Sequence, residues 1–111
     1  MIETIYTYSL ENDKKVEKLL DHPQAMINHM VFPHGAGLPE HFSNSNVYMI
    51  IVRGILTLQL GDQEPHHYQK GQLVNIPYEV KMNVGNTHED VLEIFVIKAP
   101  TPIKYKENLP L

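Results

Sequence analysis

The chain has 111 residues, a formal charge of −4 and no cysteine, and these values exclude several classes of protein. The length fits one domain with a single core, and the lack of cysteine excludes disulfides, thiolate metal sites and cysteine nucleophiles. Acids and bases are interspersed without a basic run, so we expect no nucleic-acid partner. The longest apolar run, Val47–Val52, is far shorter than the ~20 residues of a membrane helix, and the N-terminus has no signal-peptide pattern. We therefore expect a cytoplasmic, single-domain protein over residues 1–111.

Two segments near the N-terminus have distinct patterns. Residues Ile2–Tyr8 alternate apolar and polar side chains, with β-branched and aromatic members, which predicts an edge strand. Residues Glu11–Asp21 carry apolar side chains at the spacing of an amphipathic helix. The same residues fit a turn followed by a short strand, Val16–Leu20. Pro23 ends the segment under either interpretation.

From Gln24 onward, short apolar segments alternate with Gly, Pro and Asn, a pattern typical of an all-β sandwich or barrel. We expect no helix in this region. The expected strands are Ala25–Phe32, Val47–Arg53, Ile55–Leu60, His66–Gln69, Leu73–Ile76, Val80–Val84 and Val91–Lys98. Residues 99–111 contain prolines that exclude a central strand. The core is therefore expected over about residues 25–98, with a tail that lies over the surface or reaches a neighbouring subunit.

The spacing of histidine and glycine between residues 35 and 54 resembles the first motif of the cupins, G-x5-H-x-H-x3/4-E-x6-G. Gly54 occupies the closing position and His41 the first histidine position, with Gly35 or Gly37 near the opening position. Ser43 stands in place of the second histidine, and Val47 in place of the glutamate.

The second cupin motif, G-x5-P-x-G-x2-H-x3-N, is matched in part further along the chain. Gly71, Pro77 and Asn86 stand at the right intervals, whereas Glu79 replaces the glycine and Met82 the histidine. The resemblance covers residues 25–98. It implies a double-stranded β-helix, or jelly-roll, barrel of one domain.

The resemblance also bears on cofactors. In cupins three histidines and the glutamate commonly bind a divalent metal, which performs the chemistry of dioxygenases, isomerases and decarboxylases. Of the four ligand positions, only that of His41 keeps a strong donor here, because valine has none, a thioether is soft and a serine hydroxyl is a poor ligand. We therefore expect no cofactor. A divalent metal remains possible if His29, His34 or His88 joins His41 in a rebuilt site.

Period-two alternation predicts the lining of such a barrel. Every second residue of Val47–Arg53 and of Val80–Val84 is apolar, which predicts an apolar interior whose main polar group is His41. Such an interior suits a small, partly apolar molecule, with Asn44 among the polar groups at the mouth. The predicted ligand-binding residues are His41, Ser43, Asn46, Met49 and Met82. The methionines and leucines could equally fill the barrel as core residues.

The strand Val47–Val52 is apolar on both faces, and together with the proline-containing tail this predicts a homodimer. For function we carry three hypotheses. The first is a binder of a small, partly apolar molecule without metal catalysis. The second is a metal-dependent cupin enzyme, of oxygenase or isomerase type, that uses His41 and a rebuilt ligand set. The third is a structural or interaction module with a filled barrel.

Overall fold

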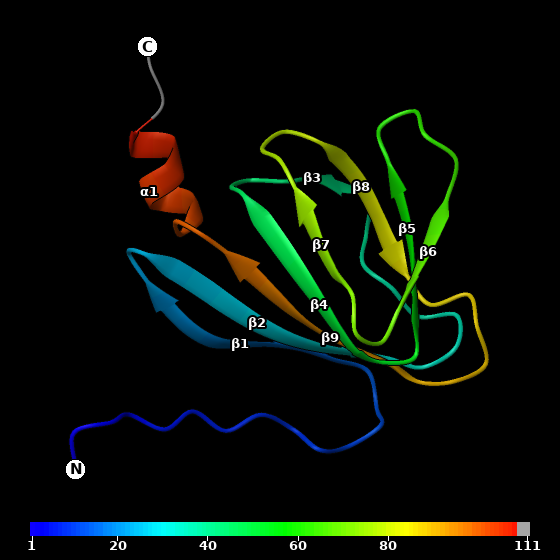
Figure 1. Ribbon diagram of the computed structural model, residues 1–111, viewed down its shortest axis with the longest axis horizontal. Helices are drawn as coiled ribbons and strands as arrows, with labels where there is room; N and C mark the ends of the chain where they lie inside the picture. The colour runs from blue at the N-terminus through cyan, green and yellow to red at the C-terminus, as the bar shows by residue number, and fades with distance from the viewer. Residues whose placement is uncertain (109–111) are drawn as a thin grey trace.

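A computed structural model describes residues 1–108, in which two antiparallel β-sheets face each other and a short helix follows the last strand (Figure 1). The elements are β1 (Lys15–His22), β2 (Ala25–Phe32), β3 (His41–Phe42), β4 (Val47–Arg53), β5 (Ile55–Leu60), β6 (His66–Gln69), β7 (Leu73–Ile76), β8 (Lys81–Gly85), β9 (Leu92–Lys98) and α1 (Pro102–Glu107). The five-stranded sheet has the order β1-β2-β9-β4-β7, and the four-stranded sheet has the order β3-β8-β5-β6.

This architecture confirms the all-β prediction. Each of the seven strands expected after Gln24 is present, and the bounds of two of them differ slightly, because β8 covers residues 81–85 and β9 begins at Leu92. The two-residue strand β3 was not predicted. It is too short to show an alternation, and it exists because it pairs with β8, with His41 opposite Met82.

The N-terminal predictions need two corrections. Residues Ile2–Tyr8 form no strand, although Ile2 and Ile5 project from an extended chain and are largely exposed. An alternating pattern becomes a strand only where a neighbouring strand offers backbone partners. The helical interpretation of Glu11–Asp21 is wrong, and the alternative of a short strand is confirmed, because β1 pairs along its length with β2.

The expectation of no helix after Gln24 is wrong, because the tail forms helix α1. Helix α1 begins at Pro102, a position where proline's missing N–H costs no hydrogen bond. The residue before it, Thr101, anchors the tail to the β1–β2 hairpin, since its Oγ1 donates to Asp21 Oδ1 (2.5 Å) and its N–H to the Pro23 carbonyl (3.2 Å). Up to residue 108 the tail therefore lies over its own chain. The rest of the predicted tail, 109–111, lies outside the described residues.

The core fills the space between the two sheets. It is formed by the inward faces of the strands, in which β4 and β9 bury every second residue. Its buried members are Met30, Phe32, Val47, Met49, Ile51, Leu56, Leu58, Ile76, Met82, Val84, Leu92, Ile94 and Val96. The sheet-on-sheet arrangement follows from this alternation, because each sheet must cover its apolar face.

Two glycines permit close approaches of the backbone. Gly54, between β4 and β5, has φ +79°, and a Cβ there would lie 2.4 Å from the Val91 carbonyl oxygen. Gly37 pairs with Gly85, and a Cβ on it would lie 2.4 Å from the Val84 carbonyl oxygen. Both positions exclude any larger residue without a backbone shift. They bracket the segment that carries His41.

Candidate functional site

Two loops meet at the end of the barrel where β3 leads into β4 and β7 leads into β8. Ser43, only 2% exposed, joins them: its Oγ donates to the Pro77 carbonyl (2.5 Å) and accepts from the Val80 N–H (2.8 Å). Backbone hydrogen bonds also run from the Ser43 N–H to the Val80 carbonyl and from the Glu79 N–H to the Ser43 carbonyl, both 2.9 Å. Ser43, a predicted ligand-binding residue, therefore holds the mouth in shape.

His41, the predicted polar group of the interior, is half-buried on β3. Its Nδ1 lies 2.9 Å from the Pro39 carbonyl oxygen. Because a carbonyl only accepts, Nδ1 carries a hydrogen and donates it. In the neutral ring this leaves Nε2 as an acceptor. His41 can thus bind one hydrogen-bond donor through Nε2.

The remaining predicted residues occupy different layers of the barrel. Met49 and Met82 are 1% and 2% exposed and belong to the core between the sheets. Asn46 is half-buried, and its main-chain carbonyl accepts a hydrogen bond from the Ala99 N–H (3.1 Å). The structure thus places both methionines in the core, whereas Ser43 joins the two loops at the end of the barrel. A ligand role for these residues stays a prediction.

The donors present do not fit the metal centre that the cupin resemblance implies. Val47 is a core residue, Met82 is buried in apolar contacts, and the Ser43 hydroxyl already donates one hydrogen bond and accepts another. Within residues 1–108, no group of three or more His, Asp or Glu side chains could hold a metal ion. Elsewhere, His67 Nδ1 and His88 Nε2 form a pair 3.1 Å apart.

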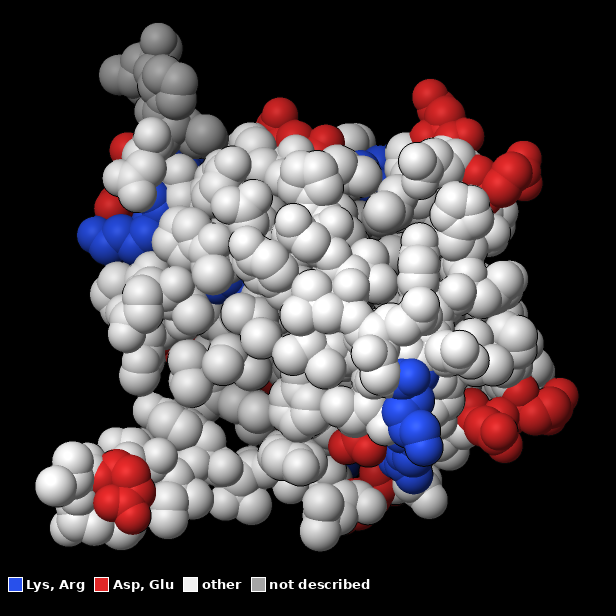
Figure 2. Space-filling model, viewed as in Figure 1, with Lys and Arg blue, Asp and Glu red and all other residues white. Residues whose placement is uncertain are grey.

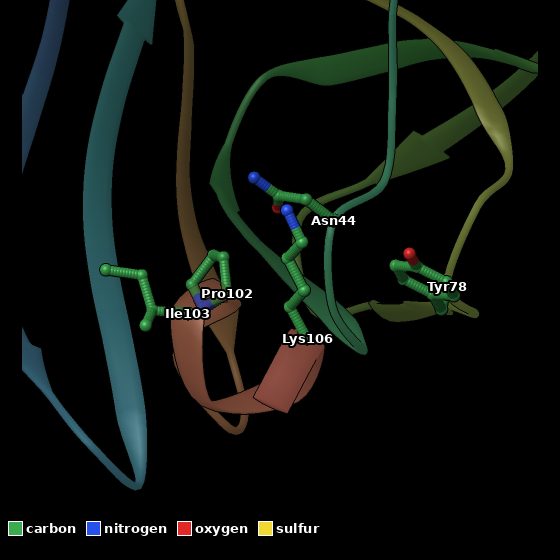
Figure 3. Close-up of a pocket in the computed structure, with 5 residues that line it drawn as sticks. All are labelled: Asn44, Tyr78, Pro102, Ile103 and Lys106. Atoms are coloured by element: carbon green, nitrogen blue, oxygen red, sulfur yellow. The ribbon is translucent and has the colours of Figure 1, made fainter. Parts of the chain in front are cut away.

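A groove of about 250 Å³ lies beside the two loops that Ser43 joins. It is lined by Asn44, Tyr78, Pro102, Ile103 and Lys106. Figure 3 shows the Lys106 side chain extending from α1 toward Asn44, with Tyr78 on one side and Pro102 and Ile103 on the other. The groove therefore combines a cation, an amide and a phenol with an apolar wall.

The electrostatics of the groove centre on Tyr78. Partial burial, followed by the charge of the neighbouring Glu79, raises the pKa of the Tyr78 phenol. The phenol thus stays protonated at neutral pH and can donate a hydrogen bond. Its ring packs on Tyr105 of α1, with centroids 4.7 Å apart and planes inclined by 31°. This contact couples the helix to the β7–β8 turn.

The turn next to the groove has an unusual backbone. Glu79 has φ +59°, in the left-handed region that glycine adopts freely and other residues adopt at a cost. It stands at the position where the second cupin motif has glycine. The sequence departs from the motif there, but the turn keeps the conformation that glycine would favour.

A second groove, of about 320 Å³, includes residues at the ends of the same turn. It is lined by Leu60, Gly61, Asp62, Gln63, Pro77 and Val80. None of the five predicted ligand-binding residues lines either groove.

Sequence reasoning found one residue of the first groove, Asn44, and missed the others. Tyr78 follows Pro77, which marks a turn but not the direction of the side chain. Pro102, Ile103 and Lys106 come from a helix too short to show a clear period. Lys106 reaches Asn44 through the packing of α1 on the β7–β8 turn, so no local pattern in the sequence indicates this pair.

Comparisons with known proteins place the chain among related structures. It is 48% identical over 105 residues to an uncharacterized protein of Methanocaldococcus jannaschii, an alignment that covers 94% of this chain and 90% of the relative. A crystal structure from the same organism, described as an RmlC-like cupin family protein with a double-stranded β-helix fold, is 47% identical, with a TM-score of 0.92 over 96% of this chain and 98% of that one.

More distant structures share the fold alone. A cupin superfamily protein of Desulfitobacterium hafniense is 13% identical with a TM-score of 0.70, covering 84% of this chain and 83% of that one. The cupin domain of Cnp3 from Schizosaccharomyces pombe is 17% identical with a TM-score of 0.72, covering 91% and 73%. No protein-family model matches the sequence. Within residues 1–108, no helix is long and apolar enough to cross a membrane.

Proposed function

Because the chain belongs to the RmlC-like cupin family and has its double-stranded β-helix fold, we propose that it is a small-molecule binder that works without the family's metal chemistry. The ligand is small, partly apolar and anionic. It binds in the groove formed by Asn44, Tyr78, Pro102, Ile103 and Lys106. The observation that carries this proposal is that one cation, two hydrogen-bonding groups and two apolar side chains line the same groove, in which Lys106 extends toward Asn44 (Figure 3).

The chemistry of the groove defines the ligand class. The Lys106 ammonium group supplies a positive charge, the Asn44 amide donates and accepts, and the Tyr78 O–H donates. Pro102 and Ile103 offer an apolar surface, and Ile103 is 70% exposed without a ligand. An aromatic or branched aliphatic carboxylate complements all of these groups, since its charge faces Lys106 while its carbon skeleton covers Ile103.

The absence of metal catalysis is supported by the donor set. Three of the four family ligand positions carry Ser43, Val47 and Met82. Val47 and Met82 are core residues, and the Ser43 hydroxyl forms hydrogen bonds with the backbone of Pro77 and Val80. His41 alone would hold a divalent ion weakly.

A nuclear magnetic resonance titration with benzoate tests the proposal. We expect benzoate to shift the amide signals of Asn44 and Ile103 with a dissociation constant near the millimolar range, as its few heavy atoms allow. Lys106→Gln should weaken benzoate about tenfold, the usual effect of losing a charged hydrogen bond. The neutral analogue benzyl alcohol should bind equally to both proteins.

Lys104→Gln is the matched control, because Lys104 lies on the same helix but pairs with Glu107 (3.0 Å). This variant should bind benzoate as the native protein does. If benzoate shifts the methyl signals of Met49 and Met82 instead, the ligand enters the barrel and the groove is the wrong site. If nothing shifts at about 10 mM, a concentration that saturates most fragment sites, the binder hypothesis fails for this ligand class.

One observation supports the third hypothesis, an interaction module. The outward face of β4 remains apolar, with Val52 37% exposed, and Leu73 on the neighbouring strand β7 is 58% exposed. In the view of Figure 2, charged side chains lie mostly toward the edges and few overlie β4 and β7. A homodimer that covers this face is compatible with ligand binding in the groove.

A further inference from the structure

A buried histidine links three strands, β1, β2 and β9, on the outer face of the five-stranded sheet. His29 on β2 is fully buried but lies outside the core between the sheets. Its Nδ1 is 2.7 Å from Glu17 Oε1 on β1, and its Nε2 is 2.6 Å from Glu93 Oε2 on β9. Ionised carboxylates only accept hydrogen bonds, so both ring nitrogens must donate. With both carboxylates ionised, this geometry requires a hydrogen on each ring nitrogen of His29 and hence a positive charge on the ring.

The charges around His29 balance. Arg53 on β4 places its Nε 3.3 Å from Glu93 Oε1, so two cations face two carboxylates. The positive charge of Lys15 adds a smaller contribution at Glu17. A charge removed from water is tolerated when it is paired and hydrogen-bonded. Removal of either carboxylate would leave the fully buried His29 ring with one nitrogen unpartnered.

Three of these residues, Glu17, His29 and Arg53, hold the segment we call the N-terminal strap, residues 8–12. The Ser9 N–H donates to Glu17 Oε1 (2.8 Å), the oxygen that also accepts from His29. The Tyr8 ring packs on the His29 ring, with centroids 4.7 Å apart. At the other end, Arg53 Nη1 donates to Asn12 Oδ1 (2.8 Å). All three anchors of the strap are thus members of the charge network or contact it.

We propose that Glu17, His29, Glu93 and Arg53 form a proton-controlled latch that holds the N-terminal strap on the sheet. The latch is closed while His29 carries both ring protons and both carboxylates are ionised. If His29 loses a proton, a nitrogen lone pair faces a carboxylate at hydrogen-bond distance, which is repulsive. The strap then leaves, and Phe95, on which Tyr8 also packs, becomes exposed.

The latch also opens in acid. The hydrogen bond from the Ser9 N–H, and then the hydrogen bond from His29, lower the pKa of Glu17. A lowered pKa means that ionised Glu17 stabilises the latched state above the carboxyl's ordinary pKa, and that this stabilisation is lost as pH falls through the lowered value. The strap is therefore bound over a window of intermediate pH and released on both sides of it.

Magnetic resonance of the intact protein tests the latch through two independent signals. The imidazole nitrogen shifts of His29 report whether both nitrogens carry protons, and hydrogen exchange of the Ser9 amide, relative to its intrinsic rate, reports strap binding. Between pH 4 and 10, we expect protection of Ser9 to fall by about tenfold or more, the usual effect of losing a charge-assisted hydrogen bond. On the alkaline side its midpoint should coincide with the deprotonation of His29.

Two variants complete the experiment. Glu17→Gln keeps the shape but removes one charge, so the alkaline midpoint should move to lower pH in both signals. Lys18→Gln changes a neighbouring charge that pairs with Asp21 on the same strand (3.7 Å), and it should leave both signals unchanged. A His29 with only one ring proton while Ser9 stays protected would overturn the proposal. So would unchanged protection throughout the pH range, or midpoints that differ between the two signals.

Discussion

The hydroxyl of Ser43 offers the sharpest test of how the mouth of the barrel is held. Ser43→Ala removes two hydrogen bonds at once, one to the Pro77 carbonyl and one from the Val80 N–H. Each is worth about 1 kcal/mol net, and a buried group left without a partner costs more. We therefore expect the free energy of unfolding to fall by about 2 kcal/mol. In a domain of this size that lowers the melting temperature by roughly 8–16 °C.

Ser45→Ala provides the matched comparison. Ser45 is equally buried, but its hydroxyl makes one hydrogen bond, to the Pro100 carbonyl (2.6 Å), so its loss should cost about 1 kcal/mol. Urea denaturation followed by far-ultraviolet circular dichroism gives both values, provided that the slope with denaturant is unchanged. A Ser43→Ala variant no less stable than Ser45→Ala would refute the claim that both hydrogen bonds of the Ser43 hydroxyl stabilise the protein. Water from the adjoining groove would then be satisfying Pro77 and Val80.

Two further predictions concern the turn and the outer face. Glu79→Gly should raise the free energy of unfolding by up to about 1 kcal/mol, because relief of the left-handed strain exceeds the added chain entropy. Glu79→Gln should leave the free energy of unfolding nearly unchanged. Both variants should lower the pKa of Tyr78, which ultraviolet titration measures. If neither variant moves that titration, the carboxylate of Glu79 does not act on the phenol. Leu73→Glu should convert a native dimer to monomers with a stability change below about 0.5 kcal/mol, as expected for an exposed site. A native protein that is already monomeric by light scattering at tens of micromolar, a range in which stable homodimers persist, would contradict the predicted dimer.

The strands were predictable because their information is local. From Ala25 to Lys98, alternation of apolar residues and the placement of Gly, Pro and Asn locate every strand except the two-residue β3. The failures share one cause. Ile2–Tyr8 has the pattern of a strand but no strand beside it to pair with, whereas Lys15–His22 has a weaker pattern and pairs with β2.

The candidate site was predictable only in part. The polar loop that contains Asn44 predicted its position at the mouth of the barrel. The other residues that line the groove come from the β7–β8 turn and from α1. The turn and the helix are held close to Asn44 by the hydrogen bond between Ser43 and Pro77 and by the Tyr78–Tyr105 contact. Such contacts join residues that are far apart in the chain, and no local pattern records them.

The sequence by itself determined the class of fold. Turn residues and alternation specify strands whose apolar faces must cover each other, and the weak or absent donors of Ser43, Val47 and Met82 at three of the family's four ligand positions are the reason why we propose a binder without metal chemistry. Only the tertiary structure decided where the polar chemistry gathers. His29, one histidine among seven in the sequence, became the centre of a charge network because strand pairing set it between Glu17 and Glu93. Composition and spacing fix what a residue can do, whereas register and loop closure fix which partners it meets.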